Sequence, residues 1–234
     1  MIPGGELAAR PLHFFWLADC SGSMAGEKIQ SLNHAIRDAI EAMRKVADNN
    51  VHAKVFVRAI KFSCGATWHV AQPTPLENFQ WKDLTAGGVT DMGRALIMLA
   101  EQLKVPPMEQ RGLPPVVVLV SDGHPSDDIK KGLAAVMAEP WGKKAVRIAI
   151  GIGKDADDNM LEKFVANLEI PVLHAHNSAE LTHYIKWAST MALQASSSPA
   201  IRDDATQVAS PFAPTQLNIP APTPLPDGHS QDVW

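Results

Sequence analysis

The sequence of 234 residues has only two cysteines, Cys20 and Cys64, and no Cys-x-x-Cys pair. A disulfide framework is therefore not expected, and we predict a reducing compartment. No apolar run approaches the ~20 residues that a membrane-spanning helix needs. The first apolar stretch is only of strand length, contains His13 and ends at Asp19, which does not fit a signal peptide. These absences predict a cytoplasmic protein.

An excess of positive charge is also missing. Lys and Arg total 21 against 25 Asp and Glu, which gives a formal net charge of −4, and no basic block occurs. We therefore expect neither nucleic acid nor an anionic membrane as a partner. Hydrophobic residues make up 46% of the chain, which is enough for a substantial buried core.

Several catalytic motifs are absent as well. The chain has no G-x-x-x-x-G-K-[ST] phosphate-binding loop and no G-x-S-x-G nucleophile turn. A cysteine phosphatase loop that starts at Cys20 would need Arg where Gly26 stands, and an aspartyl phosphatase would need Asp where Ser21 stands. Gly151-Ile152-Gly153 lacks the third glycine of a dinucleotide fingerprint and is interpreted as a tight turn.

What is present is an alternation of strand-like apolar runs with amphipathic helical patterns. It predicts an α/β fold: a doubly wound, mostly parallel central sheet with one antiparallel edge strand and helices on both faces. Between 73 and 84 we expect an irregular crossing segment, and we expect Ser178 to cap the final helix. Strands are predicted at 12–18, 51–62, 66–71, 116–120, 146–150 and 171–174, and helices after the Asp19 loop and at 93–104, 128–138, 157–168 and from 178.

Composition divides the chain into three parts. Residues 1–11 are punctuated by Gly and Pro and are predicted to be a lead-in, and residues 12–195 form one domain. Residues 196–234 are rich in Pro, Ser and Ala, which excludes a regular helix or a central strand. This tail is expected to be either flexible or a docking peptide, with Phe212 and Trp234 as apolar anchors.

One short stretch, Asp19-Cys20-Ser21-Gly22-Ser23, lies where the first strand should end and a helix should begin. At such a junction the loops of an open α/β sheet bind ligands. The D-x-S-x-S spacing lets a carboxylate and two hydroxyls face a common point, and converging oxygens suit a hard cation such as Mg²⁺. The alternative is that Asp19 and the serines only cap the first helix.

Two later loops carry matching residues, namely Thr90 in Gly87-Gly88-Val89-Thr90-Asp91 and Asp122 in Val120-Ser121-Asp122-Gly123. Together with Asp19, Ser21 and Ser23, they resemble the metal-ion-dependent adhesion site of von Willebrand factor type A domains. The likeness covers about residues 12–194. Two phrases, at 121–128 and 151–157, are most similar to the bacterial tellurite-resistance subgroup.

The resemblance implies a metal-dependent interaction module rather than an enzyme. Mg²⁺ or Mn²⁺, with Ca²⁺ less expected, would be ligated by hydroxyls, while the aspartates act through bound water and a partner's Asp or Glu completes the coordination. The subgroup implies an adaptor or scaffold in a stress-response system, with a kinase or phosphatase as partner. The proline-rich tail departs from fuller members, which carry a cysteine-bearing zinc module. The rival interpretation is a metal-dependent phosphohydrolase or nucleotide-binding protein.

Other polar residues near these loops are weaker candidates. Asp91 is interpreted as a turn residue that can also tune the site. His124 stands two residues after Asp122 and could make partner binding sensitive to pH near its ordinary pKa of about 6.5. His174 and His176 have the spacing of a zinc pair on a strand, but one packed and one solvent-facing histidine is the favoured interpretation.

Overall fold

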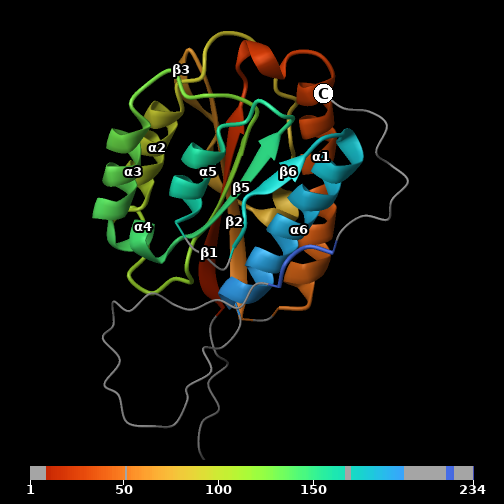
Figure 1. Ribbon diagram of the computed structural model, residues 1–234. Helices are drawn as coiled ribbons and strands as arrows, with labels where there is room; N and C mark the ends of the chain where they lie inside the picture. Colours follow the sequence, from red (N-terminus) through yellow and green to blue (C-terminus); the bar gives the residue numbers. More distant parts are fainter. Residues whose placement is uncertain (1–8, 51, 167–169, 198–219, 224–233) are drawn as a thin grey trace, which may run out of the picture.

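A computed structural model describes residues 9–50, 52–166, 170–197, 220–223 and 234, with backbone only at 196 and 197. Its centre is a sheet of six strands in the order β3-β2-β1-β4-β5-β6 (Figure 1). Neighbouring strands run parallel except β2 and β3, which confirms the predicted antiparallel edge. The strands are β1 (Arg10–Asp19), β2 (Ala53–Ser63), β3 (Gly65–Pro75), β4 (Val116–Ser121), β5 (Val146–Ile152) and β6 (Leu173–Ala175).

Helices cover both faces of the sheet. In Figure 1, α2, α3 and α4 lie on one side of the sheet, and α1 and α6 pack together on the other. No helix in the described ranges is long and apolar enough to cross a membrane. The α-helices are α1 (Glu27–Asp48), α2 (Met92–Gln102), α3 (Ile129–Ala138), α4 (Pro140–Lys144), α5 (Asp158–Val165) and α6 (Ser178–Ser197).

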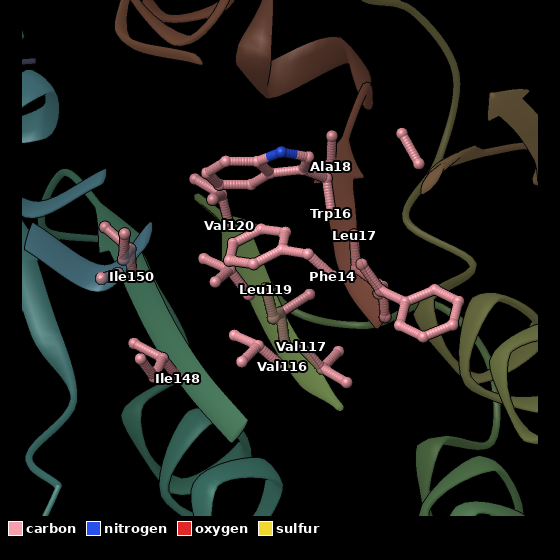
Figure 2. Packing of buried hydrophobic residues seen from close by; sticks show 14 of the residues in the cluster. Phe14, Trp16, Leu17, Ala18, Val116, Val117, Leu119, Val120, Ile148 and Ile150 are labelled. Atoms are coloured by element: carbon pink, nitrogen blue, oxygen red, sulfur yellow. The ribbon is translucent and has the colours of Figure 1, made fainter. Parts of the chain in front are cut away.

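The two central strands, β1 and β4, are buried on both faces. Their nearly continuous apolar sequences are typical of parallel strands enclosed by helices. Figure 2 shows Phe14 and Trp16 extending from β1 over β4 toward Ile148 and Ile150 of β5. Both strands end in a polar residue, β1 in Asp19 and β4 in Ser121. Because the two strands are parallel neighbours, these side chains lie at the same edge of the sheet.

Several strand boundaries differ from the sequence prediction, among them those of β1, β3 and β6, which begins at Leu173 rather than at residue 171. β1 begins at Arg10, which was assigned to the lead-in, because its main chain pairs with β2 from that residue onward. β3 was expected to end at residue 71, but it continues to Pro75. An edge strand tolerates proline because its outer N–H groups need no partner. Register shifts between Val57 and Ile60 of β2 accompany this longer pairing.

The helical predictions were wrong in several details. Helix α5 ends at Val165 rather than at residue 168, because Ala166 takes a left-handed conformation. The short helix α4 was not predicted, and Asn177 rather than Ser178 caps α6, because its Oδ1 accepts a hydrogen bond from the Glu180 N–H at 2.9 Å. The backbone of α6 also continues to Ser197, two residues into the predicted tail. Most of that tail, including Phe212, and residues 1–8 lie outside the described residues.

The crossing segment that leads to the Thr90 loop is fixed by one buried side chain, Asn33 of α1. Its Nδ2 donates to the Leu84 carbonyl at 2.9 Å, and its Oδ1 accepts from the Leu84 N–H at 2.8 Å and from the Trp81 indole at 2.9 Å. Leu76 and Phe79 of the same segment are buried. Asn33 thus makes the two hydrogen bonds to the Leu84 backbone that a neighbouring strand would otherwise make.

Replacing Asn33 with Ala is expected to lower the free energy of unfolding by about 2–4 kcal/mol, because three groups lose their partner at a buried position. Urea denaturation followed by circular dichroism measures the change. Asn159→Ala, on the exposed side of α5, is the matched control and should change stability by less than about 0.5 kcal/mol. Equal effects of the two substitutions would contradict the role assigned to Asn33.

Candidate metal centre

Three loops meet at the carboxyl edge of the sheet. The first follows β1 and the second follows β4, and these strands are direct neighbours. The third loop, which precedes α2, is joined to the first by backbone hydrogen bonds from Gly87 N–H to the Cys20 carbonyl at 2.8 Å and from Gly22 N–H to the Gly88 carbonyl at 2.9 Å. Segments about 70 and 100 residues apart in sequence thus form one polar cluster.

Side chains of the first two loops are connected by a chain of hydrogen bonds. The Ser21 and Ser23 hydroxyl oxygens are 2.9 Å apart and share a hydrogen bond, and the Ser23 hydroxyl donates to Asp122 Oδ1 at 2.7 Å. Asp19 is joined to the same cluster, because its Oδ1 accepts the Ser21 N–H at 2.8 Å. Asp19 and Asp122 are only 0% and 1% exposed. Four of the five predicted residues therefore come together.

The backbone of Thr90 is held by the loop that follows Asp122. Its N–H donates to the Ser126 hydroxyl at 3.0 Å, and its carbonyl accepts the Ser126 N–H at 2.9 Å. Asp127 strengthens the connection, because its carboxylate accepts the Gly93 N–H at 2.7 Å at the start of α2. Thr90 is itself buried.

The capping alternative for the first loop is wrong. Helix α1 begins at Glu27 with Gly26 as its N-cap residue, and no side chain makes a capping hydrogen bond there. A short 3₁₀ turn, η1 (Gly22–Met24), lies between the loop and α1, and Ser21 does not cap it either. Asp19 and the serines are thus directed to one another rather than to a helix end.

A close approach of two loops explains two of the glycines. A Cβ on Gly22 would be 3.3 Å from the Gly88 carbonyl oxygen, and a Cβ on Gly88 would be 2.6 Å from the Cys64 sulfur. Gly88 also has a φ of +92°, which disfavours any other residue. Gly22 therefore allows the close contact between the two loops.

The electrostatics of the cluster centre on two buried carboxylates. Burial raises the pKa of Asp19, and the negative charge of Asp122 adds to this, while hydrogen bonds from Ser121 and Ser21 oppose it. The Ser121 hydroxyl donates to Asp19 Oδ2 at 2.6 Å. Lys28, in the first turn of α1, donates to Asp122 Oδ2 at 2.6 Å. The hydroxyls and one ammonium group thus offset two negative charges at this edge.

The donor set fits a hard divalent cation. Every side chain that the cluster directs inward, apart from Lys28, offers oxygen, and hydroxyls with carboxylates are the donors that Mg²⁺ and Mn²⁺ prefer. Within the described ranges, no group of three or more His, Cys, Asp or Glu converges on one point. A metal in this part of the chain therefore depends on serine and threonine hydroxyls.

The remaining candidates take other positions. Asp91 joins the loops, because Oδ2 accepts the Gly65 N–H at 2.7 Å and Oδ1 accepts the Ser126 hydroxyl at 2.8 Å. His124 is exposed and its Nδ1 lies 2.9 Å from Asp157 Oδ2, which lowers the pKa of Asp157. His174 and His176 do not take part in a metal cluster among the described residues.

Sequence reasoning missed Ser121, Lys28, Ser126 and Asp127, which hold the site residues. Each contacts a residue at least 34 positions away, so no local pattern marks it. The one available signal for Ser121 was its place beside Asp122 at the end of a buried strand. Lys28 carried no signal, because a lysine in the first turn of an amphipathic helix is ordinarily solvent-exposed.

Trp234, from the tail, lies at the border of this site. Its N–H donates to the His176 carbonyl at 3.4 Å, and its side chain packs against the hydrophobic core. A Cβ on Gly153, after β5, would be 3.7 Å from the Trp234 carbonyl oxygen and 3.6 Å from Lys28 Nζ. The tail thus reaches the neighbourhood of the lysine that contacts Asp122.

Comparisons with known proteins agree with this architecture. The sequence matches the model of the von Willebrand factor type A domain over residues 15–186. A search of curated proteins found no match.

Three solved structures share the fold. A von Willebrand factor type A protein from Catenulispora acidiphila has a TM-score of 0.58 and 17% identity, over 79% of this chain and 43% of that one. Proximal thread matrix protein 1 from the mussel byssus, with a zinc-occupied MIDAS motif, has a TM-score of 0.57 and 16% identity, over 80% of this chain and 46% of that one. The ArnB paralog VWA2 from Sulfolobus acidocaldarius has a TM-score of 0.54 and 18% identity, over 77% of this chain and 45% of that one. The chain spans less than half the length of each.

Ser121→Ala is expected to lower the free energy of unfolding by about 1–3 kcal/mol in the presence of chelator, because the buried Asp19 carboxylate loses a donor. Urea titration measures the difference. Ser31→Ala is the control, because Ser31 is also buried but lies within α1, and a change below about 0.5 kcal/mol is expected there. If Ser121→Ala is as stable as Ser31→Ala, the hydrogen bond from Ser121 to Asp19 does not contribute to stability.

Proposed function

Because this chain belongs to the von Willebrand factor type A domain family, we propose that it is an interaction module that binds a protein partner through a divalent metal ion. Proteins of this family are generally metal-dependent interaction modules without enzymatic activity. The observation that carries the proposal is the hydrogen-bonded chain from Ser21 through Ser23 to Asp122, which joins loops 99 residues apart. Such a chain gathers oxygen ligands at one point of the sheet edge.

The proposed metal ligands are of two kinds, neutral hydroxyls and charged carboxylates. The hydroxyls of Ser21, Ser23 and Thr90 are neutral and bind the ion directly, while Asp19 and Asp122 act mainly through ordered water. Neutral ligands leave the ion strongly electrophilic, so a partner's Asp or Glu is a favourable further ligand. The bonds that Asp19 accepts from Ser121 and Ser21 fix its orientation for this role.

We propose Mg²⁺ or Mn²⁺ as the ion. One structural neighbour is described with zinc in its MIDAS motif, but zinc prefers imidazole and thiolate ligands in proteins. In the described ranges, His and Cys do not gather in a metal-binding group. Oxygen donors alone favour the harder cations.

The finer assignment is a role in a bacterial tellurite-resistance or stress-response system. The sequence phrases at 121–128 and 151–157 support it, and a kinase or phosphatase of that system is the proposed partner, with this chain as adaptor or scaffold in the cytoplasm. The contact of Trp234 with His176 supports the docking interpretation of the tail. We therefore propose that the tail binds near the metal loops.

Mg²⁺ is expected to raise the melting temperature of the wild-type protein by about 5–10 °C at a hundredfold excess over the dissociation constant, since binding to the native state then contributes about 2.7 kcal/mol. Asp19→Ala should abolish the increase, and Thr90→Ala should reduce it. Differential scanning calorimetry with Mg²⁺ and with chelator measures both.

Glu41→Ala, which removes an exposed carboxylate from α1, is the control and should keep the full increase. An identical shift in all variants would mean that the ion binds elsewhere. Release of phosphate from generic esters by the wild type, lost in Asp19→Ala, would favour the phosphohydrolase interpretation instead.

Lys28→Gln is expected to increase the affinity for Mg²⁺ by about tenfold, because the ammonium group that contacts Asp122 no longer repels the ion. Isothermal titration calorimetry gives the two dissociation constants. Lys130→Gln, on the exposed side of α3, removes the same charge from a remote position and should leave the affinity unchanged. A weaker affinity in Lys28→Gln would show that the lysine supports the ion.

A further inference from the structure

A second polar site lies away from the metal loops. A cavity of ≈ 450 Å³ is bordered by Phe56, Arg58, Trp68, Gln72, Gln102 and Glu109. Arg58 pairs in register with Phe15, four residues before Asp19 in β1. At the rise of a strand this separation is about 13 Å. The cavity is thus distinct from the candidate metal centre, and its volume is that of a small-molecule site.

The feature that needs an explanation is Arg58, which is only 3% exposed. One Nη donates to Gln102 Oε1 at 2.6 Å, and the other reaches His13 Nδ1 at 3.5 Å. Nε is buried without a hydrogen-bond partner. The nearby carboxylate of Glu109 attracts Arg58 by its charge but makes its close contact with His13 instead. Buried charges are ordinarily paired, because an unpaired one loses its hydration without compensation.

Aromatic rings hold the guanidinium group without satisfying its N–H groups. Its central carbon lies 4.5 Å from the centre of the Phe15 ring and 5.9 Å from that of Trp68. Such cation–π contacts orient a planar cation but accept no directional hydrogen bond from its edge. Burial lowers the pKa of Arg58 to about 10, against the opposite effect of the Glu109 charge, so the group keeps its charge at neutral pH. The guanidinium group is therefore charged, oriented and incompletely paired.

The other charged group at the cavity is Glu109, and it restricts the ligand. Its side chain is 48% exposed, and its Oε2 lies 2.9 Å from His13 Nε2. Burial lowers the pKa of His13, and the charge of Arg58 acts in the same direction, against the hydrogen bond to Glu109. At neutral pH the cavity thus combines one buried cation with one half-exposed anion. Because Glu109 repels every further negative charge, a ligand with one negative charge at Arg58 is favoured over phosphates and nucleotides, which carry more.

We propose that this cavity binds a small aromatic monocarboxylate, with the carboxylate at Arg58 and the ring beside Trp68 and Phe56. A carboxylate matches the edge of a guanidinium group in shape and charge. Trp68 and Phe56 supply apolar surface for a flat ring, and the amides of Gln72 and Gln102 offer further hydrogen bonds. This function is independent of the proposed metal-dependent role.

The test uses the full chain and benzoate as the probe, with benzamide as a neutral molecule of the same shape. Isothermal titration calorimetry in chelator should give saturable binding of benzoate and at least tenfold weaker binding of benzamide. Inorganic phosphate should not compete with benzoate. Equal binding of benzoate and benzamide would overturn the proposal, since the cavity would then be merely apolar, and so would the absence of benzoate binding.

Two variants test whether benzoate binds in this cavity. Arg58→Gln should weaken benzoate binding at least tenfold. Ala71→Trp, at an exposed position on the cavity border, should block the cavity and leave the core intact. An undiminished affinity in Ala71→Trp would overturn the proposal even if Arg58→Gln fails to fold. The melting temperature in chelator is the folding control and should be equal in Ala71→Trp and the wild type.

Discussion

Two carboxylates, those of Asp19 and Asp122, are buried beside each other at the carboxyl edge of the sheet, and the rest of the site depends on how their charge is offset. Removing a charge from water is costly unless hydrogen bonds or an opposite charge replace the hydration. Ser121, Ser21 and Ser23 supply hydrogen bonds, and Lys28 supplies one positive charge. The balance remains incomplete, since burial, and to a smaller extent the charge of Asp122, still raises the pKa of Asp19. A divalent cation is therefore a natural further partner.

The position of the third loop depends on contacts at both of its ends. Asn33 holds the incoming segment at Leu84, and Ser126 and Asp127 hold the outgoing backbone at Thr90 and Gly93. Loops ordinarily vary more than the elements that they connect. Here the side chains of α1 and of the loop after β4 give the Thr90 loop a fixed place against the sheet. The position of the Thr90 loop is thus fixed by its contacts with the rest of the fold rather than by the loop itself.

Two buried charged centres occupy different parts of the same pair of strands. Asp19 ends β1, whereas Arg58 stands in the middle of β2 opposite Phe15. The carboxylates at the strand end lie in a ring of hydroxyls, and the guanidinium group lies between aromatic rings with few acceptors. The buried carboxylates are thus stabilised by hydrogen-bond donors, whereas the buried guanidinium group is stabilised by aromatic faces and an amide oxygen.

The sequence by itself determined the layered α/β architecture, because the apolar runs of β1 and β4 and the periodicity of α1 depend on local spacing. Through the resemblance to von Willebrand factor type A domains, it also indicated Asp19, Ser21, Ser23, Thr90 and Asp122 as one group, since each of these positions carries the expected side chain. Tertiary structure decided the rest. Lys28, Ser121 and Asn33 act on residues 94, 102 and 51 positions away, and the isolation of Arg58 becomes visible only when β1, β2, β3 and α2 are packed together. Such roles are set by neighbours in space, which no local pattern encodes.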